Sequence, residues 1–412
     1  MALGLDRVRD VWSRLGVRLE AVVVTVGGTN GKGSCVAMLD AILRAGGYRV
    51  ATYTSPHIER FNERIRVNGE EADDATLCDG FEAVERARGG TPLTYFEHTT
   101  LVALWVFARH PLDCVVLEVG LGGRLDAVNI IDPDVALVST VDLDHIEWLG
   151  PDREHIGREK AGIFRAGRVA VFGGADPPRS LGAHAASIGA RLAVADRDFA
   201  ATHRDDGWDW RGVGSSRHGL PLPALRGDFQ VRNAAAVLAA LEAVADRLPL
   251  SNAAVRAGLL AARLPGRFEV FPGPVTVILD VAHNPEAARS VVENLARLRE
   301  GAGGRTLAVF SMLRDKDIAG VVHTLAPLVD RWFYAPVRAG RAAARDQLAG
   351  ALAEVGAGSS EGHDDLDAAF GAALREARPG DRILGFGSFY TVAALRPLVG
   401  RVDCGADRRP LL

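Results

Sequence analysis

A glycine-rich turn that carries one lysine follows the first strongly apolar run of the chain. The run covers residues 21–26, and the turn, residues 27–34, reads Gly-Gly-Thr-Asn-Gly-Lys-Gly-Ser and leads directly into a helical pattern. Backbone N–H groups in such a turn and the positive end of a helix dipole face an anion, and Lys32 adds a mobile charge. The stretch differs from the standard Walker sequence, whose first glycine position is occupied here by Val26. The turn predicts a binding site for a nucleotide phosphate.

Polar side chains follow three further apolar runs, at the point where each predicted strand ends. They are Ser55 after residues 50–53, Glu118 near the end of 114–119, and Asp142, Asp144 and His145 after 135–140. Because ligands of parallel sheets sit at the carboxyl ends of the strands, we expect these residues to share one edge with the Lys32 turn. A hydroxyl, a carboxylate and an imidazole around a triphosphate suit Mg²⁺, which keeps few protein ligands and binds substrate phosphates.

The ordinary structural explanations of these residues differ in strength. A carboxylate in so apolar a strand is costly without a partner, so a plain surface charge does not explain Glu118. Ser55 could equally be a turn residue before Pro56, and His145 a structural histidine. Lys160, which lies between Glu159 and Ala161, reads by itself as a solvated lysine on a helix.

A second set of polar residues lies in the last third of the chain. Arg267 belongs to a proline-rich linker, and Asp280 and His283 follow the first strand predicted beyond it. Asn284 and Pro285 predict the N-cap and the first residue of a helix, whatever the function. Nucleotide contacts from both parts of the chain would place the reacting centre between two domains.

Strand-like and helical patterns alternate along most of the chain, which predicts parallel sheets covered by helices. In the first part we expect strands at residues 22–26, 50–53, 114–119, 135–140 and 169–172, and helices at 35–43, 76–88, 99–108 and 230–245. Residues 195–225, with Trp208, Trp210 and several glycines and prolines, predict either a small antiparallel elaboration or a loop. Later strands are expected at 275–280, 306–310, 331–334 and 382–386, and helices at 285–298 and 318–325.

Three prolines within residues 263–274 interrupt this alternation. A chain of 412 residues exceeds a comfortable single core, so two domains are expected. We predict an α/β protein with a mainly parallel P-loop ATPase domain over residues 1–268, carrying the small β elaboration. A smaller Rossmann-like α/β domain follows over residues 269–412.

Composition excludes several classes of protein. The net charge of −4, without a basic run interleaved with aromatic residues, argues against nucleic acid as a partner. No apolar stretch is long enough to span a bilayer, and acidic residues interrupt the N-terminal segment where a signal peptide needs an apolar one. The four cysteines, Cys35, Cys78, Cys114 and Cys404, lack metal-ligand spacing. We expect a cytoplasmic protein with reduced thiols, acting as a monomer.

The motifs, taken in order and with their spacing, resemble those of the Mur ligase superfamily and, within it, the dihydrofolate synthase/folylpolyglutamate synthase family. The likeness runs from Arg7 to about residue 398. It rests on residues 28–34, 54–57, 93–97, 117–126, 144–145, 157–163, 264–268, 280–285, 315–317 and 387–389. The chain departs from the family pattern at Val128, where threonine is usual, and at Tyr390, where histidine is common.

The resemblance implies an ATP-dependent ligase that joins a carboxylate to the amino group of L-glutamate through an acyl phosphate. Dihydropteroate and tetrahydrofolate derivatives would both be substrates, and a monofunctional folylpolyglutamate synthase is the alternative. A peptidoglycan-precursor ligase would need a further domain ahead of the phosphate loop, for which residues 1–26 leave no room. A regulatory nucleotide switch is the competing class, and it would need mobile segments that sense the γ-phosphate.

The resemblance also implies roles for individual residues. ATP contacts are implied for Thr29, Asn30, Gly31, Lys32, Gly33, Ser34, Asn233, Arg267 and Asp280. Two Mg²⁺ sites are implied for Ser55, Glu118, His145 and Lys160, the lysine being carbamylated, and K⁺ is a further candidate ion. The pterin segments match Thr94, Tyr95, Phe96 and Glu97 together with Leu125, Asp126 and Ala127, whereas His283 and Ser388 are candidates for glutamate. The candidate catalytic residues are Lys32, His145, Lys160 and His283.

Overall fold

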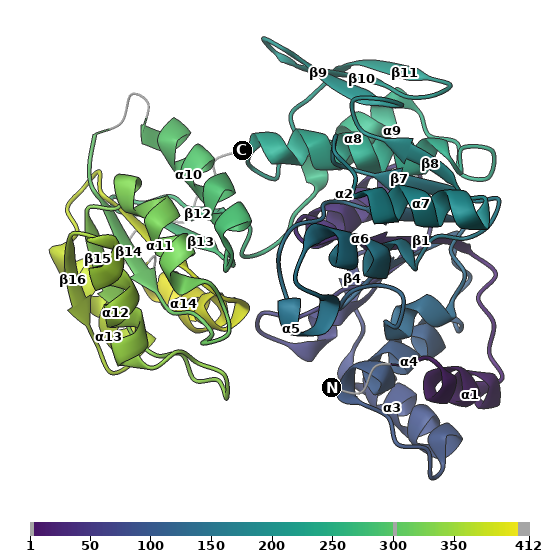
Figure 1. Cartoon of the computed structure of the whole chain (residues 1–412), viewed down its shortest axis with the longest axis horizontal. Coiled ribbons are helices and arrows are strands. Elements are labelled where there is room, and N and C mark those ends of the chain that lie inside the picture. Colours follow the sequence, from purple (N-terminus) through teal and green to yellow (C-terminus); the bar gives the residue numbers. More distant parts are fainter. Residues whose placement is uncertain (1–3, 300–302, 403–412) are drawn as a thin grey trace. The chain divides into compact units, whose positions relative to one another are not determined.

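The computed structural model describes residues 4–299 and 303–402 of the chain. The chain divides into two compact units, Met1–Arg263 and Leu264–Leu412, called here unit 1 and unit 2 (Figure 1). The division falls a few residues before the expected boundary between residues 268 and 269. Within the described residues, every helix is too short or too polar to span a lipid bilayer.

The main sheet of unit 1 is mostly parallel. Its strand order is β4-β3-β2-β5-β1-β6-β7-β8. In the described sheet the pairs β4/β3 and β3/β2, at one side, are antiparallel, and the other pairs are parallel. The bounds are β1 Val22–Gly27, β2 Val50–Tyr53, β3 Ile65–Val67, β4 Glu70–Glu71, β5 Cys114–Glu118, β6 Val135–Val138, β7 Val169–Phe172 and β8 Arg191–Val194. Every residue of β1, β2, β5 and β6 is buried, because parallel strands are covered on both faces.

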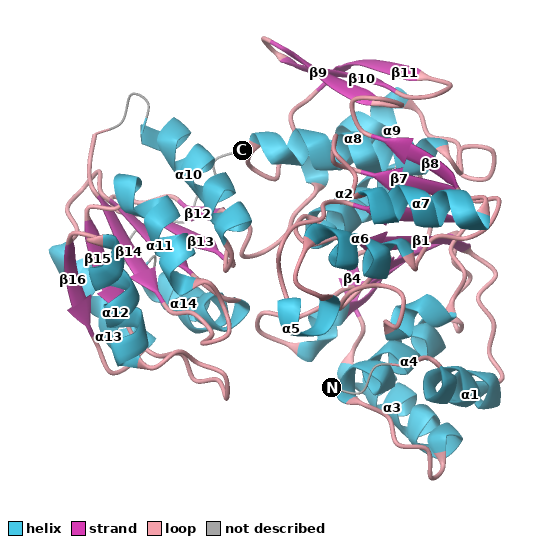
Figure 2. Ribbon diagram, in the orientation of Figure 1, coloured by secondary structure: helices cyan, strands magenta, loops and turns pink. Residues whose placement is uncertain are grey.

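Helices flank this sheet (Figure 2). Their bounds are α1 Asp6–Leu15, α2 Lys32–Ala45, α3 Asp74–Arg88, α4 Tyr95–Phe107, α5 Ile146–Leu149, α6 Arg153–Ala161, α7 Arg179–Ile188, α8 Asp228–Glu242 and α9 Asn252–Ala261. Short 3₁₀ turns add Phe61–Arg64 and Ala127–Ile130. The predicted parallel α/β architecture is therefore confirmed for unit 1.

A small antiparallel sheet, predicted for residues 195–225, is also present. It consists of β9 Ala200–Arg204, β10 Gly207–Arg211 and β11 Ser216–Leu220. Trp208 and Trp210 are both buried on it, and the Trp210 indole N–H donates to the carbonyl oxygen of Ala235 in α8 at 3.1 Å. The two tryptophans thus anchor the small sheet, and Trp210 ties it to a helix of unit 1.

Unit 2 is a second α/β layer structure. Its strand order is β12-β13-β17-β14-β15-β16, with β12 antiparallel to β13 and the other described pairs parallel. The strands are β12 Glu269–Phe271, β13 Thr276–Asp280, β14 Thr306–Phe310, β15 Arg331–Tyr334, β16 Ser359–Gly362 and β17 Arg382–Phe386. The helices are α10 Pro285–Arg299, α11 Ile318–Leu325, α12 Arg345–Val355, α13 Leu366–Glu376 and α14 Phe389–Val402, and a 3₁₀ turn spans Ala326–Leu328.

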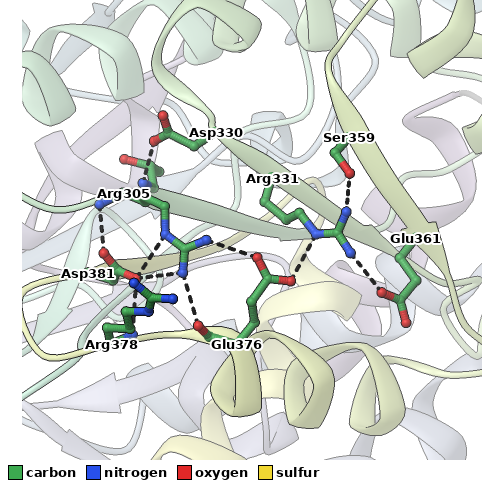
Figure 3. Close-up of polar contacts among 9 residues, drawn as sticks. Arg305, Asp330, Arg331, Ser359, Glu361, Glu376, Arg378 and Asp381 are labelled. Carbon is green, nitrogen blue, oxygen red and sulfur yellow. Dashed lines mark hydrogen bonds and ion pairs between the residues drawn. The ribbon is translucent and has the colours of Figure 1, made fainter.

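An ion-pair network ties the amino ends of the unit 2 strands together (Figure 3). Arg305, just before β14, pairs with Asp381 at 2.9 Å and with Glu376 at 3.0 Å. Arg331, the first residue of β15, pairs with the same Glu376 at 2.9 Å and with Glu361 at 3.0 Å. Since these residues lie at the strand ends opposite to the predicted ligand edge, the network supports the fold of unit 2.

Asp381 is the buried member of this network, and its replacement by asparagine is expected to destabilise unit 2. Burial by itself raises the pKa of Asp381. The carboxylate, however, accepts from the backbone N–H groups of Arg305 and Arg378, at 2.8 and 3.0 Å, and contacts the Arg305 guanidinium. These interactions outweigh the effect of burial, and they hold the pKa of Asp381 below its usual range. The charge therefore stabilises the folded state above the ordinary carboxyl pKa, and this stabilisation disappears as the pH falls through the lowered pKa.

For Asp381→Asn we expect the free energy of unfolding to fall by about 2 kcal/mol at neutral pH, because the Arg305 guanidinium loses its charged partner. Denaturant titrations at neutral and acidic pH measure this difference, which is expected to shrink in acid. The matched control is Asp364→Asn, since that carboxylate is exposed and pairs with Arg345 at the surface. An equal loss for the two variants, or a loss that does not depend on pH, would contradict this assignment.

Candidate active site

The loop between β1 and α2, residues 28–31, is held by the segment that follows β6. The backbone N–H of Thr29 donates to the carbonyl oxygen of Thr140 at 2.8 Å, and the N–H of Asn30 donates to the Thr140 hydroxyl at 3.1 Å. The Thr29 hydroxyl donates to the carbonyl oxygen of Asp142 at 3.1 Å and accepts from its N–H at 3.0 Å. Thr140 was not among the residues predicted for the site, although its place at the end of a predicted strand was a usable signal.

Two glycines allow this loop to approach its neighbours closely. Gly28 and Gly31 have φ angles of 143° and 83°. A Cβ atom on Gly28 would lie 1.9 Å from the Ser139 hydroxyl oxygen, and one on Gly31 would lie 2.8 Å from the Asn233 amide oxygen. Any larger residue would therefore push the loop away from β6 and α8.

The first turn of α2 places the remaining loop residues. Lys32 begins the helix, and its ammonium donates to two carbonyl oxygens of the loop at 3.0 and 3.1 Å. Gly33 and Ser34 follow and are buried. The Ser34 hydroxyl accepts from the Gln230 amide nitrogen at 3.2 Å, and the Gln230 amide oxygen accepts from Asn233 at 3.1 Å. Gln230, which the sequence analysis missed, thus links α8 to the start of α2.

Glu118 and Ser55 lie together beside this loop. Glu118 ends β5 and is paired in register with Val26 of β1, directly before the loop. Only 5% of Glu118 is exposed, and its carboxylate accepts from the backbone N–H of Ser55 at 3.2 Å. Burial is the main cause that raises the pKa of the neighbouring Cys35 thiol to about 12, and the negative charge of Glu118 adds to it. The structure therefore places a buried carboxylate and a hydroxyl-bearing residue at the carboxyl ends of adjacent parallel strands.

His145 lies on the same segment that supports the loop. It has a φ of 52°, in the left-handed region, and its ring Nε2 lies 3.8 Å from a carboxylate oxygen of Asp144. Within the described residues, no cluster of three or more histidine, cysteine, aspartate or glutamate side chains could hold a metal ion. Mg²⁺ commonly completes its shell with phosphate and water oxygens, so the partial donor set at Glu118 and Ser55 fits a cation that arrives with a nucleotide.

Lys160 is buried, which excludes the interpretation of the isolated motif as a solvated helix lysine, an interpretation that the family resemblance had already set aside. It lies near the end of α6 and is 4% exposed. The helix end packs on the glycine-rich segment after Glu118, because the Arg124 N–H donates to the Glu159 carbonyl oxygen at 2.8 Å. A Cβ on Gly123 would lie 3.1 Å from the Lys160 carbonyl oxygen. Tertiary packing therefore brings the backbone of Lys160 beside the glycine-rich segment that follows Glu118.

Comparison with known proteins decides the family. The model of the Mur ligase middle domain matches residues 26–241, and that of the Mur ligase glutamate ligase domain matches residues 266–389. The chain is 45% identical to the dihydrofolate synthase/folylpolyglutamate synthase of Escherichia coli (strain K12), over 96% of this chain and 91% of the relative. The chain belongs to the Mur ligase family.

Other relatives and solved structures agree. The dihydrofolate synthase/folylpolyglutamate synthase of Haemophilus influenzae is 36% identical over 95% of this chain and 92% of its own. The structure of Escherichia coli FolC in complex with DHPP and ADP matches with a TM-score of 0.92 and 44% identity, covering 98% of this chain and 94% of that one. A bifunctional folylpolyglutamate synthase/dihydrofolate synthase with Mn, AMPPNP and L-glutamate bound matches with a TM-score of 0.90 and 45% identity, over 97% and 95% of the chains.

In this Mur ligase the first candidate pterin segment forms the start of α4. Thr94 and Glu97 make a capping box, in which the Glu97 N–H donates to the Thr94 hydroxyl at 3.3 Å and the Glu97 carboxylate accepts from the Thr94 N–H at 2.7 Å. Glu97 also pairs with Arg7 at 2.8 Å. Tyr95 is 60% exposed and Phe96 is half-buried. Thr94 and Glu97 therefore shape the helix end, and the two aromatic rings remain as ligand-facing candidates.

The second candidate pterin segment is organised by Asp126. Its buried carboxylate accepts from the N–H groups of Leu121 and Val128 at 2.9 and 3.1 Å. Burial raises the pKa of Asp126 to about 6, against these hydrogen bonds and the charge of Lys32. Leu125 is half-buried and Ala127 is buried. Asp126 therefore fixes this turn of the Mur ligase and titrates closer to neutral pH than an ordinary carboxyl group.

The candidate residues of unit 2 gather at the carboxyl end of β13. Asp280 is buried and accepts from the N–H groups of Phe268 and Ala282, each at 2.7 Å. Burial raises the pKa of Asp280, and the Arg267 charge partly opposes this. The Arg267 guanidinium lies 5.3 Å from the centre of the Phe389 ring.

Two further residues of unit 2 have capping roles. The Ser388 hydroxyl accepts from the Thr391 N–H at 3.0 Å at the start of α14. The Asn284 side chain accepts from the Ala287 N–H at 2.8 Å, so the predicted N-cap of α10 is confirmed. His283, which follows β13 directly, contacts the Val281 carbonyl oxygen through Nδ1 at 2.8 Å. The capping contacts explain Ser388 and Asn284 structurally.

Proposed function

We propose that this protein is an ATP-dependent ligase that adds L-glutamate to dihydropteroate, forming dihydrofolate, and to reduced folates, forming folylpolyglutamates. The observation that carries this proposal is the lysine-bearing loop after β1, with the buried carboxylate of Glu118 on the adjacent strand. Membership of the Mur ligase family and the match to its glutamate ligase domain support it. The bifunctional relatives favour two activities over the monofunctional alternative.

The reaction requires activation of a carboxylate, because its negative charge repels an amine and oxide is a poor leaving group. The loop N–H groups and Lys32 hold the triphosphate while a substrate carboxylate oxygen attacks the γ-phosphorus and ADP leaves. The glutamate amine then attacks the acyl carbon, inorganic phosphate leaves, and the amine gives up a proton. A divalent cation, when bound, offsets the charge crowded between donor and acceptor.

We assign the cation as Mg²⁺ in two sites, with Ser55, Glu118, His145 and carbamylated Lys160 as ligands and K⁺ as a further candidate ion. Asn233, Arg267 and Asp280 are assigned to ATP, and His283 and Ser388 to glutamate. The protein is further proposed to act as a monomer in the cytoplasm, without nucleic acid as a partner.

Composition supports carbamylation of Lys160. Of the 48 lysines and arginines in the chain, only three are lysines, at positions 32, 160 and 316. An arginine cannot lose its proton and form a carbamate, whereas a buried lysine amine can lose one. The chain uses arginine at nearly all of its basic positions, so a lysine at a buried position fits a site whose chemistry requires a primary amine.

Carbamylation predicts a carbonyl carbon on Lys160 that exchanges with bicarbonate. Protein equilibrated with isotopically labelled bicarbonate is expected to show one carbamate signal by carbon NMR, absent from Lys160→Arg. That variant keeps the positive charge but cannot form the carbamate, and we expect it to lose most ligase activity. Active enzyme that shows no carbamate signal would overturn the assignment.

ADP formation tests the proposed function as a whole. We expect ADP only when an acyl substrate and L-glutamate are both present, with dihydropteroate and tetrahydrofolate each effective as the acyl substrate. Turnover of tetrahydrofolate alone would establish the monofunctional alternative. ADP release that neither glutamate nor dihydropteroate stimulates would favour a nucleotide switch.

A further inference from the structure

Arg64 is a buried cation without an anionic partner in the part of the chain that the structure describes. It ends the turn Phe61–Arg64, directly before β3, and only 7% of it is exposed. Its Nε donates to Nδ1 of His57 at 2.8 Å. Its guanidinium carbon lies 5.9 Å from the ring centre of Phe61 and 5.6 Å from that of Tyr95. No carboxylate of the described residues forms an ion pair with it.

The neighbouring groups do not balance this charge. His57 accepts through Nδ1 and is therefore neutral, and burial, together with the Arg64 charge, lowers its pKa. The adjacent carboxylate of Glu63 is occupied by the backbone N–H groups of Ile58, Glu59 and Arg60, at 2.7 to 2.8 Å. A buried guanidinium without a counter-charge costs stability, so its retention points to an anion that comes from outside the chain.

The position of Arg64 indicates which anion this is. Its carbonyl oxygen accepts from the Thr54 N–H at 2.9 Å, so Arg64 lies beside the residue before Ser55. Its guanidinium contacts Tyr95, the exposed ring of a candidate pterin segment. The charge therefore lies next to the segment expected to receive the acyl substrate.

We propose that Arg64 binds a carboxylate of the acyl substrate, with Phe61 and Tyr95 holding the plane of its guanidinium. This inference rests on the proposed function. Dihydropteroate carries one carboxylate, the one that reacts, whereas a folate that already bears glutamate carries a reacting carboxylate and a spectator. Guanidinium binds carboxylates through paired N–H groups, which gives orientation as well as charge.

Equilibrium binding tests this without turnover. Wild-type protein is expected to bind dihydropteroate more tightly than its uncharged amide by about tenfold or more, the effect of a charge-assisted hydrogen bond. Arg64→Met is expected to abolish this preference, and Arg64→Lys to retain part of it. The matched control is Arg66→Gln. Arg66 lies two residues after Arg64 and forms an exposed ion pair with Glu71, so this variant removes a charge outside the proposed site. If folded Arg64→Met keeps the full preference, Arg64 does not bind the reacting carboxylate, and only the kinetic comparison with tetrahydrofolate can then support the proposal.

Steady-state kinetics then identifies the carboxylate. A rise in KM of about tenfold for both dihydropteroate and tetrahydrofolate assigns Arg64 to the reacting carboxylate, and a rise for tetrahydrofolate alone assigns it to the spectator. Unchanged KM for both, with an unchanged acid-over-amide preference, overturns the proposal. If wild-type protein does not join glutamate to either acyl substrate, the proposed function is wrong. The acid-over-amide binding preference still tests the role of Arg64, because it is measured without turnover. Thermal unfolding establishes that each variant is folded, and Arg64→Lys covers the case in which Arg64→Met is not.

Discussion

Lys32→Met is expected to lower kcat for ADP formation by about a hundredfold to a thousandfold, the effect of removing one charged donor from a developing transition state. The ammonium lies over the loop, where loop carbonyl oxygens hold it at 3.0 and 3.1 Å and where a β- or γ-phosphate would take their place. Methionine keeps the length and apolar stem of the side chain. Folding should therefore be nearly unaffected, since the loop is held by the segment after β6.

Two further variants make the Lys32 result specific. Lys32→Arg retains the charge, but its wide planar group does not fit a site built for an ammonium, so we expect a large loss here as well. Arg18→Met removes an exposed charge of unit 1 and is expected to keep wild-type activity. ATP binding by calorimetry and ADP formation by a coupled assay provide the two readouts. Near wild-type turnover by Lys32→Met would remove the phosphate-loop assignment.

Glu118→Gln is expected to lower the ligase activity without lowering the stability of the fold. Glutamine preserves the shape and can still accept from the Ser55 N–H, but it removes the charge that would face a cation and its phosphates. We expect kcat to fall by about a hundredfold or more. Because taking a carboxylate charge out of water is costly, the free energy of unfolding should stay the same or rise when glutamine replaces it.

Melting temperature and the dependence of rate on Mg²⁺ concentration measure these two effects of Glu118→Gln. The comparison is Glu82→Gln, at an exposed carboxylate of α3 that pairs with Arg86. We expect Glu82→Gln to leave both readouts unchanged. A Glu118→Gln enzyme with normal kcat and a normal Mg²⁺ response would show that this carboxylate has only a structural role.

The elements that could be predicted share a strong local signal. β1, β2 and β7 were expected almost to the residue, because apolar and β-branched runs of that length have few alternatives. The edge strands β4 and β16 were missed, since their residues, such as Glu70 and Ser360, are exposed and polar. The alanine-rich helices α12 and α13 were missed as well.

The candidate site residues also divide into those with a strong local signal in the sequence and those without one. The glycine-rich loop could be recognised from sequence because its function needs a contiguous turn at the start of a helix, and Glu118 because a charge within an apolar strand is costly by itself. Arg64 could not be recognised, since an arginine between Glu63 and Ile65 looks like any solvated residue. Its significance depends on which groups surround it, and those come from several segments.

The sequence by itself therefore determined the alternating α/β pattern, the phosphate loop and the family of this protein, all of which reside in local spacing. Only the tertiary structure decided that Lys160 is buried and that Ser55 reaches Glu118. It also decided that Arg64 has aromatic and imidazole neighbours but, among residues 4–299 and 303–402, no carboxylate in an ion pair with it. Burial and charge pairing are properties of residues far apart in the chain. They are set by the strand order that places β5 between β2 and β1, and no local pattern encodes that order.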